Sequence, residues 1–472
     1  MSDQIKKALA TAGVFFNPML NVPALMGLLL LSPLLLPFVR LPTEVPMYDQ
    51  LRIAVVVVII VAGYISLVFY PIRARASMGA LSLLLAAVGF LVGFGFTDDS
   101  NVLEISLALT LLWFIAPLLP FAQKNIFHQA VSVLLLLFAL SLFVAALFAW
   151  LPFCVFEYRC RSLQSSYVGF ENKRLLNDVQ NLLVPVLLGV WLVATRQVVR
   201  RLALMAFGGM LWLGFLLDSR GLMLSLSIVA ILVCIVERPR LRTLVPPVIM
   251  GTLALLSWWS VQAIVAVGTS TTAASIRTGD SGRFELWTYS IERILAAPWT
   301  GYGPGAFATE GNFVSSPHNI LLTVGYDYGV LVALLVAVVM VGLFWSILTF
   351  RRTPLAASIA WGLLVLMIAS LVSSPHITPL GQLFYVIAVA VTLATDERLS
   401  RWWYRHAAKE VTGMRTFRTS GVVLWSVVCG ALIWSMLATY PAAYDEPKRH
   451  KPRVWLDGEY SSNAVAPELF SR

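Results

Sequence analysis

The sequence predicts an all-α polytopic membrane protein with about 12–13 transmembrane helices and one large outer loop that contains short, non-spanning helices. Hydrophobic residues make up 59% of the 472 residues and charged residues only 12%, and the mean hydropathy is +0.81. These values lie far outside the composition of soluble domains. The net charge of +10 comes from basic residues scattered between apolar runs, and this pattern excludes a basic nucleic-acid-binding face.

The apolar runs are continuous, and most approach the ~20 residues that a helix needs to cross a bilayer. An outer-membrane barrel would instead show short stretches of alternating hydrophobicity. The predicted spanning helices occupy residues 18–39, 51–71, 79–96, 102–121, 127–152, 179–195, 202–218, 221–236, 244–266, 320–350, 355–372, 377–395 and 419–440.

The distribution of charge predicts the orientation of these helices, because short loops rich in lysine and arginine stay in the cytoplasm. With the N-terminus inside, the inner loops hold most of the basic residues, among them Lys124, Arg200, Arg240 and Arg352. The outer loops are richer in acidic residues, among them Asp98, Glu171, Asp280 and Glu310.

Two outer loops, 153–178 and 267–319, are longer than ordinary connections and are therefore the expected functional segments. The predicted organisation is a helical bundle over 1–440, which includes both loops, and a polar C-terminal tail over 441–472. In the first loop, the spacing of Cys154 and Cys160 is open both to a disulfide and to two free thiols. No histidine lies near this pair, so the spacing does not indicate a metal site.

The second outer loop is predicted to contain a non-spanning helix that begins near Arg283. Residues 280–282 form a capping sequence, and Pro298 follows as a stop signal. Apolar residues recur at helical spacing, so the helix is expected to lie against the bundle or at the membrane interface. These apolar residues are Phe284, Leu286, Trp287, Ile291, Ile294 and Leu295.

A glycine-rich segment, Gly301-Tyr302-Gly303-Pro304-Gly305, follows this helix. Glycine permits close backbone approach, and proline restricts the path of the chain. Neither a preceding strand nor the correct glycine spacing supports a dinucleotide site. Two interpretations stay open: a tight turn, and a cradle of backbone N–H groups for a phosphate.

His318 is the sharpest single candidate for chemistry, because a histidine can take a proton from a hydroxyl near neutral pH. The alternative is a capping or interface histidine. Arg220 and Arg283 are predicted to face the same outer cavity, where guanidinium groups would bind an anionic diphosphate. Arg277 is a third candidate. For Arg220, a bridge to Asp218 or to lipid headgroups is the competing interpretation.

A second tetrapeptide, Ser373-Ser374-Pro375-His376, repeats Ser315-Ser316-Pro317-His318. Both copies fall on the outer side of the predicted topology. Four residues are too few to establish a duplication, but His376 is a further candidate for lining the cavity.

Taken in order, several pieces of the chain resemble the bacterial O-antigen ligases and their relatives, the O-antigen polymerases and pilin-type O-oligosaccharyltransferases. The matching pieces are Ser219-Arg220-Gly221, Ser281-Gly282-Arg283 with Leu286-Trp287, Pro298 with Gly301-Tyr302-Gly303, and His318-Asn319 with Asp327-Tyr328-Gly329. Two features depart from the family: aspartate stands at 327 where glutamate is frequent, and an additional span at 419–440 would place the tail outside.

The resemblance implies a GT-C-like membrane glycosyltransferase of the bacterial inner membrane, with its active site facing the periplasm. It would transfer a glycan from undecaprenyl diphosphate to a sugar of lipid A–core, in an inverting reaction without metal or cofactor. His318 would be the general base or would orient the acceptor, and Arg220 and Arg283 would hold the diphosphate. The expected substrate-binding residues are Arg277, Asn319, Gly301, Gly303, Trp287, Asp327 and His376.

Three other functions are alternatives. A polymerase would transfer the glycan to a second lipid-linked glycan, and an O-oligosaccharyltransferase would transfer it to a protein such as pilin. A transporter should show internal repeats and charges near mid-membrane. The polar candidates instead gather on one side, which favours chemistry at the membrane surface.

Overall fold

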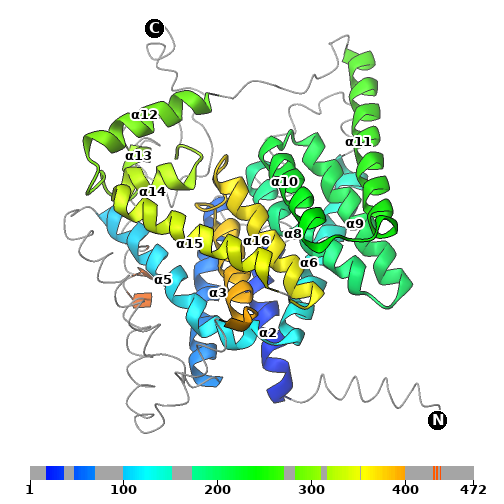
Figure 1. Cartoon of the computed structure of the whole chain (residues 1–472), viewed down its shortest axis with the longest axis horizontal. Coiled ribbons are helices and arrows are strands. Elements are labelled where there is room, and N and C mark those ends of the chain that lie inside the picture. Colours follow the sequence, from blue (N-terminus) through cyan, green and yellow to red (C-terminus); the bar gives the residue numbers. More distant parts are fainter. Residues whose placement is uncertain are drawn as a thin grey trace.

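The computed structural model of the chain describes residues 18–36, 47–69, 99–150, 173–269, 282–309, 316–350 and 352–398, together with 429, 430, 432, 433 and 436. All regular secondary structure within these residues is helical (Figure 1). The prediction of an all-α membrane protein is confirmed. The predicted span 79–96, most of 419–440 and the tail 441–472 lie outside the described residues.

The helices follow one another with short connections over most of the described chain. Their bounds are α2 Pro18–Leu31, η1 Ser32–Leu35, α3 Met47–Phe69, α5 Asp99–Ala122, α6 Asn125–Ala145, η2 Ala146–Trp150, α8 Lys173–Val193, α9 Gln197–Leu216, α10 Arg220–Glu237, α11 Leu241–Thr269, α12 Arg283–Ala296, α13 Ala306–Thr309, α14 Ile320–Tyr328, α15 Val330–Thr349, α16 Pro354–Ser370 and α17 Pro379–Ala394.

Eight helices of the described chain are long and apolar enough to cross a membrane, and three shorter apolar helices accompany them. The eight are α3, α5, α6, α8, α9, α10, α11 and α15. The shorter ones are Val22–Leu35, α16 and α17. Helices therefore occupy every predicted span that falls within the described ranges. The outer loop predicted at 153–178 is shorter than expected, because α8 already begins at Lys173.

The centre of the bundle is formed by α8 and α16, which pack closely together. A Cβ atom added to Gly189 on α8 would lie 2.4 Å from the Cβ atom of Ser358 on α16, so the two backbones approach as small residues allow in membrane helices. At the periphery, only 11% of α15 and 11% of the stretch Arg242–Val261 of α11 are buried in the protein. Their exposed leucine and valine side chains are the expected lipid-facing surface.

The two ends of the bundle carry different connections. Short turns with basic residues join helices at one end, at Lys124, Arg196, Arg238 and Arg352. The opposite end holds the turn 217–219, the segment 282–329 and the turn 371–378. We call this second end the site end, because it carries the described candidate residues.

The prediction of one continuous span over 320–350 is wrong. The chain forms two helices, α14 and α15, which meet at Gly329 with a φ of 86°. A Cβ atom at this position would lie 2.6 Å from the carbonyl oxygen of Trp299. The N–H of Val330 donates to the carbonyl of Pro298 at 2.7 Å. The break is set by contact with a distant loop, so the overall hydropathy of the segment did not show it.

Candidate functional site

A small aromatic core supports the site end of the bundle. Ile294 of α12, Phe307 of α13 and Tyr326 of α14 form a buried cluster separate from the main core. The rings of Tyr302 and Phe307 each lie 5.1 Å from that of Tyr326. Figure 1 shows these three helices grouped together near the start of α5. Aromatic packing of this kind holds α12, α13 and α14 together, and we call these three helices the platform.

His318 lies on this platform in a constrained position. Its side chain is 8% exposed, and its φ of 57° lies in the left-handed region, where residues other than glycine are uncommon and mark a site that merits attention. The indole N–H of Trp287 donates to the carbonyl of Pro317 at 2.9 Å. The side chain of Asn319 accepts from the N–H groups of Leu321 and Leu322, and so caps α14. Trp287 and Asn319 thus fix the chain on both sides of His318.

The two Ser-Ser-Pro-His tetrapeptides meet in space. Nδ1 of His318 is hydrogen-bonded to Oγ of Ser374, and that oxygen lies 2.9 Å from Oγ of Ser316. His376 of the second copy contacts the hydroxyl of Thr323 at 3.4 Å. The second serine of each copy therefore contacts the other copy. The sequence showed the repeat, but only the fold shows that its copies interlock.

The turn that carries Ser374 is held by polar residues from three other helices. The Arg52 guanidinium donates to the carbonyl of Ile377 at 2.6 Å and to the side chain of Gln382. Gln382 donates to the carbonyl of His376 at 3.0 Å, and Thr378 donates to Asp178 at 2.7 Å. Arg52, Asp178 and Gln382 were missed as site-supporting residues. A buried arginine at the start of an apolar run is costly in a membrane, and this was the available signal.

Arg220 begins α10 beside the same turn. A Cβ atom on the next residue, Gly221, would lie 3.8 Å from the Cβ atom of Ser373. Ser219, which precedes Arg220, donates a hydrogen bond to the side chain of Asn177. The half-buried Arg220 therefore begins its helix next to Ser373 of the second tetrapeptide. Ser373 directly precedes Ser374, the serine that contacts His318.

Arg283 begins α12, the helix that contacts the His318 segment through Trp287. Arg283 and Trp287 are four residues apart, so they share one face of this helix, and Trp287 contacts the carbonyl of Pro317. Arg277 lies outside the described residues. Among the candidates that the structure describes, His318, Arg220 and Arg283 are all positioned at the site end.

Comparison with known proteins agrees with this arrangement. Residues 205–337 match the family model described as O-antigen ligase, and this segment runs from α9 into α15. This segment of the chain is similar to the O-antigen ligase family. The resemblance predicted from the sequence is confirmed, and it supports a function of the O-antigen ligase or polymerase type, in a family of membrane glycosyltransferase-like enzymes. A search of the curated proteins found no match.

Within the matched segment, the glycine-rich sequence is a turn pinned to α14. The N–H groups of Tyr302 and Gly303 donate to the carbonyls of Tyr326 and Asp327 at 2.9 Å, and that of Gly301 donates to Ala297 at 3.1 Å. These donors are occupied within the protein, so the geometry favours the tight turn over the phosphate cradle. Asp327 is completely buried beneath this turn, which favours a supporting role for it over direct contact with a glycan.

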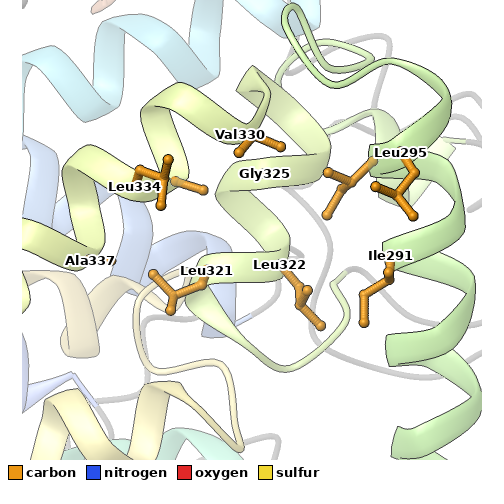
Figure 2. A pocket seen from close by; sticks show the side chains of 10 residues that line it. Ile291, Leu295, Leu321, Leu322, Gly325, Val330, Leu334 and Ala337 are labelled. Atoms are coloured by element: carbon orange, nitrogen blue, oxygen red, sulfur yellow. The ribbon is translucent and has the colours of Figure 1, made fainter.

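An apolar groove lies beside the platform, between α12 on one side and α14 with the first turns of α15 on the other (Figure 2). Its volume is about 260 Å³. The residues that line it are Ile291, Ile294, Leu295, Leu321, Leu322, Gly325, Val330, Ala333, Leu334 and Ala337. A groove without polar groups suits a hydrocarbon chain and cannot satisfy the hydroxyl groups of a sugar.

Among the described residues, no group of three or more histidine, cysteine, aspartate or glutamate side chains is arranged to hold a metal ion. The loop cysteines Cys154 and Cys160 lie outside the described residues, and the described cysteines, Cys234 and Cys429, are free thiols.

Proposed function

We propose that this chain is an O-antigen ligase that transfers a glycan from undecaprenyl diphosphate to a sugar hydroxyl of lipid A–core, at the periplasmic face of the inner membrane. The observation that carries the proposal is that His318 and two helices that begin with an arginine, α10 and α12, lie at the same end of a membrane bundle. Two cations and one titratable group at a membrane surface fit a reaction between a lipid diphosphate and a hydroxyl.

Each of these groups has a defined task in the proposed reaction. A new bond forms between the acceptor oxygen and the anomeric carbon, and the bond from that carbon to the diphosphate oxygen breaks with inversion. The leaving diphosphate gains negative charge, which Arg220 and Arg283 would stabilise through charge-assisted hydrogen bonds. His318 would meet the acceptor hydroxyl, either to remove its proton or to orient it.

The apolar groove supports a lipid-linked donor. Leu334 lines the groove and is also 57% exposed on α15, whose surface faces outward from the bundle. The groove is therefore continuous with the lipid-facing surface, and a polyprenyl chain can enter it sideways from the membrane. His318 lies two residues before the start of α14, which forms one wall of the groove. The donor's hydrocarbon chain would thus lie next to the reacting end.

The decisive genetic test compares lipopolysaccharide and lipid-linked glycan in a strain deleted for this gene. Full-length glycan retained on the carrier, together with bare lipid A–core, is the expected result. Single repeats on the core would identify a polymerase instead. If both pools were unchanged and a glycoprotein lost its glycan, the acceptor would be a protein and the ligase proposal would fall.

We predict that His318→Ala and Arg283→Ala each lower the rate of transfer by at least about 100-fold, as loss of an acid–base group or a charge-stabilising donor does. The assay is glycan transfer by purified protein in lipid nanodiscs, with thermal unfolding to check folding. Arg196→Ala is the matched control, because this exposed arginine lies at the opposite end of the bundle.

Normal transfer by a folded His318→Ala or Arg283→Ala protein would remove that residue from the mechanism. Added chelator is expected to leave the rate unchanged. A loss that divalent metal restores would contradict the proposed metal-free reaction.

A further inference from the structure

The helix α8 carries polar side chains near its start, within a largely apolar sequence. These residues are Asn177, Asp178, Gln180 and Asn181, and the last three are at most 3% exposed. Buried polar groups inside a membrane bundle are costly, so they mark contacts that the protein uses. Gln180 donates to the carbonyl of Met210 at 2.8 Å and joins α8 to α9. Asn177 and Asp178 instead bind residues of the site end.

Asn177 holds the residue that precedes Arg220. Ser219 is 5% exposed, and its hydroxyl donates to Oδ1 of Asn177. Ser219 is the N-cap residue of α10, whose first residue is Arg220. The carbonyl of Ser219 accepts from the N–H of Met223 at 3.0 Å, which closes the first turn of the helix. Asn177 therefore fixes the place at which the backbone of Arg220 begins α10.

Asp178, the next residue along α8, holds the turn that contacts His318. The hydroxyl of Thr378 donates to Oδ2 of Asp178 at 2.7 Å. Thr378 directly follows Ile377, whose N–H donates to the carbonyl of Ser374 at 3.1 Å and closes the turn. The hydroxyl of Ser374 contacts Nδ1 of His318. Asp178 therefore anchors the end of the turn whose beginning meets the histidine.

The two anchors keep a fixed spacing because they are neighbours in one helix. Consecutive Cα atoms are about 3.8 Å apart, and the close contact between α8 and α16 holds α8 in the centre of the bundle. The two anchored segments also meet each other. A Cβ atom on Gly221, next to Arg220, would lie 3.6 Å from Cγ2 of Val372 and 3.8 Å from Cβ of Ser373. α8 is thus a common support for the Arg220 helix start and for the Ser374 turn.

We propose that Asn177 and Asp178 are positioning residues that set the distance between Arg220 and His318. This inference rests on the proposed function, in which Arg220 stabilises the leaving diphosphate and His318 meets the acceptor hydroxyl. Inversion requires the acceptor oxygen, the anomeric carbon and the leaving oxygen to lie nearly in line. The two groups must therefore keep a fixed separation across the sugar, and a displacement of about 1 Å can lower the rate about 100-fold.

The first test measures this separation without an assay of transfer. Cβ atoms 3.8 Å apart, as at positions 221 and 373, are within the range that a disulfide bridges. In a chain whose four native cysteines are replaced by serine, Gly221→Cys and Ser373→Cys should therefore cross-link on mild oxidation in nanodiscs. We expect Asn177→Leu and Asp178→Leu each to slow this cross-linking at least about fivefold, because disulfide formation requires a specific geometry.

Gln180→Leu is the matched control, because it removes an amide from the same part of α8 but breaks a contact with α9. It should cross-link at the rate of the parent chain. Thermal unfolding checks that each variant is folded, and an alanine at position 177 or 178 replaces a leucine that prevents folding. Equal cross-linking rates in the folded variants at 177, 178 and 180 would overturn the inference, whatever their transfer activity.

The second test measures kcat before and after the cross-link forms. Under reducing conditions, Asn177→Leu and Asp178→Leu should each lower kcat at least about tenfold, as misplacement of reacting groups does. Asn177→Asp keeps an oxygen that accepts from Ser219, so it should retain at least about half of the rate. After oxidation the disulfide replaces the lost anchor, and each leucine variant should come within about twofold of the cross-linked parent.

The outcomes separate this inference from the proposed function. A tenfold loss that persists in the cross-linked Asn177→Leu and Asp178→Leu chains would contradict the positioning role, while transfer by the unaltered chain would leave the ligase proposal standing. Absence of transfer by the unaltered chain would instead overturn the ligase proposal. The cross-linking rates would then still decide whether α8 sets the spacing.

Discussion

At the scale of single residues, the site end depends on backbone conformations that few side chains allow. Gly301 has a φ of 67°, and a Cβ atom there would lie 2.6 Å from the carbonyl oxygen of Asp327. His318 also adopts a left-handed conformation, and it does so without the freedom of glycine. Its neighbours Trp287 and Asn319 hold the chain in place. The strained histidine is thus supported by hydrogen bonds that its own sequence motif supplies in part.

We predict that Gly301→Ala destabilises the protein by about 2 kcal/mol or more, because it adds both left-handed strain and a backbone clash. The measurement is thermal unfolding in detergent, together with the rate of transfer. Gly282→Ala is the matched control for strain alone, since Gly282 has a φ of 75° but no atom within 4 Å of an added Cβ. Equal melting temperatures for the two variants would show that the predicted clash is relieved at no cost.

At the scale of elements, α12 does two tasks along one face. Trp287, in its first half, donates to the carbonyl of Pro317 in the His318 segment. Ile291 and Leu295, one and two turns further along the same face, line the apolar groove against α14 and α15. An amphipathic helix at a membrane surface buries its apolar face in this way. One short helix therefore connects the proposed lipid-binding groove with the residues proposed for chemistry.

We predict that Ala337→Phe, which adds a ring at the end of the groove, raises the KM for a long polyprenyl donor about tenfold. It should leave the KM for a donor with a two-isoprene chain nearly unchanged, because a short chain need not reach this position. Val338→Phe is the matched control, as Val338 is 67% exposed and does not line the groove. Equal changes of the two KM values in both variants would contradict the proposal that the groove binds the polyprenyl chain.

At the scale of the whole molecule, the bundle separates its basic turns from its site. The connections at Lys124, Arg196, Arg238 and Arg352 lie at one end, and the segment 282–329 lies at the other. The positive-inside rule would place the first end in the cytoplasm. The proposed site then faces the periplasm, where the lipid-linked donor would be available from the outer leaflet.

We predict opposite labelling at the two ends of the bundle. In a chain whose four native cysteines are replaced by serine, Thr300→Cys should react with a membrane-impermeant maleimide in spheroplasts. Gln197→Cys should react only after the membrane is permeabilised. Both positions are exposed in the structure, so the membrane alone sets the difference. Labelling of Gln197→Cys in sealed spheroplasts would reverse the proposed orientation.

Much of the fold could be predicted because apolar run length is a local property. Spans such as 202–218 and 221–236 agree with α9 and α10 within a few residues. The loop helix also begins at Arg283 as expected, since glycine at 282 and Pro298 mark its limits. The continuous helix over 320–350 was wrong, because the break at Gly329 depends on contacts with Pro298 and Trp299 about thirty residues earlier.

From the sequence alone, this protein could be assigned as a helical membrane protein with charged residues near one surface. Composition, run length and the order of short motifs sufficed, because a bilayer imposes the same constraint on every span. The folded arrangement was needed to show that Ser374 contacts His318, that Arg52 holds the turn beside it, and that the glycine segment is a turn. These contacts join residues far apart in the chain, and their hydrogen bonds depend on distances and directions that no local pattern of residues encodes.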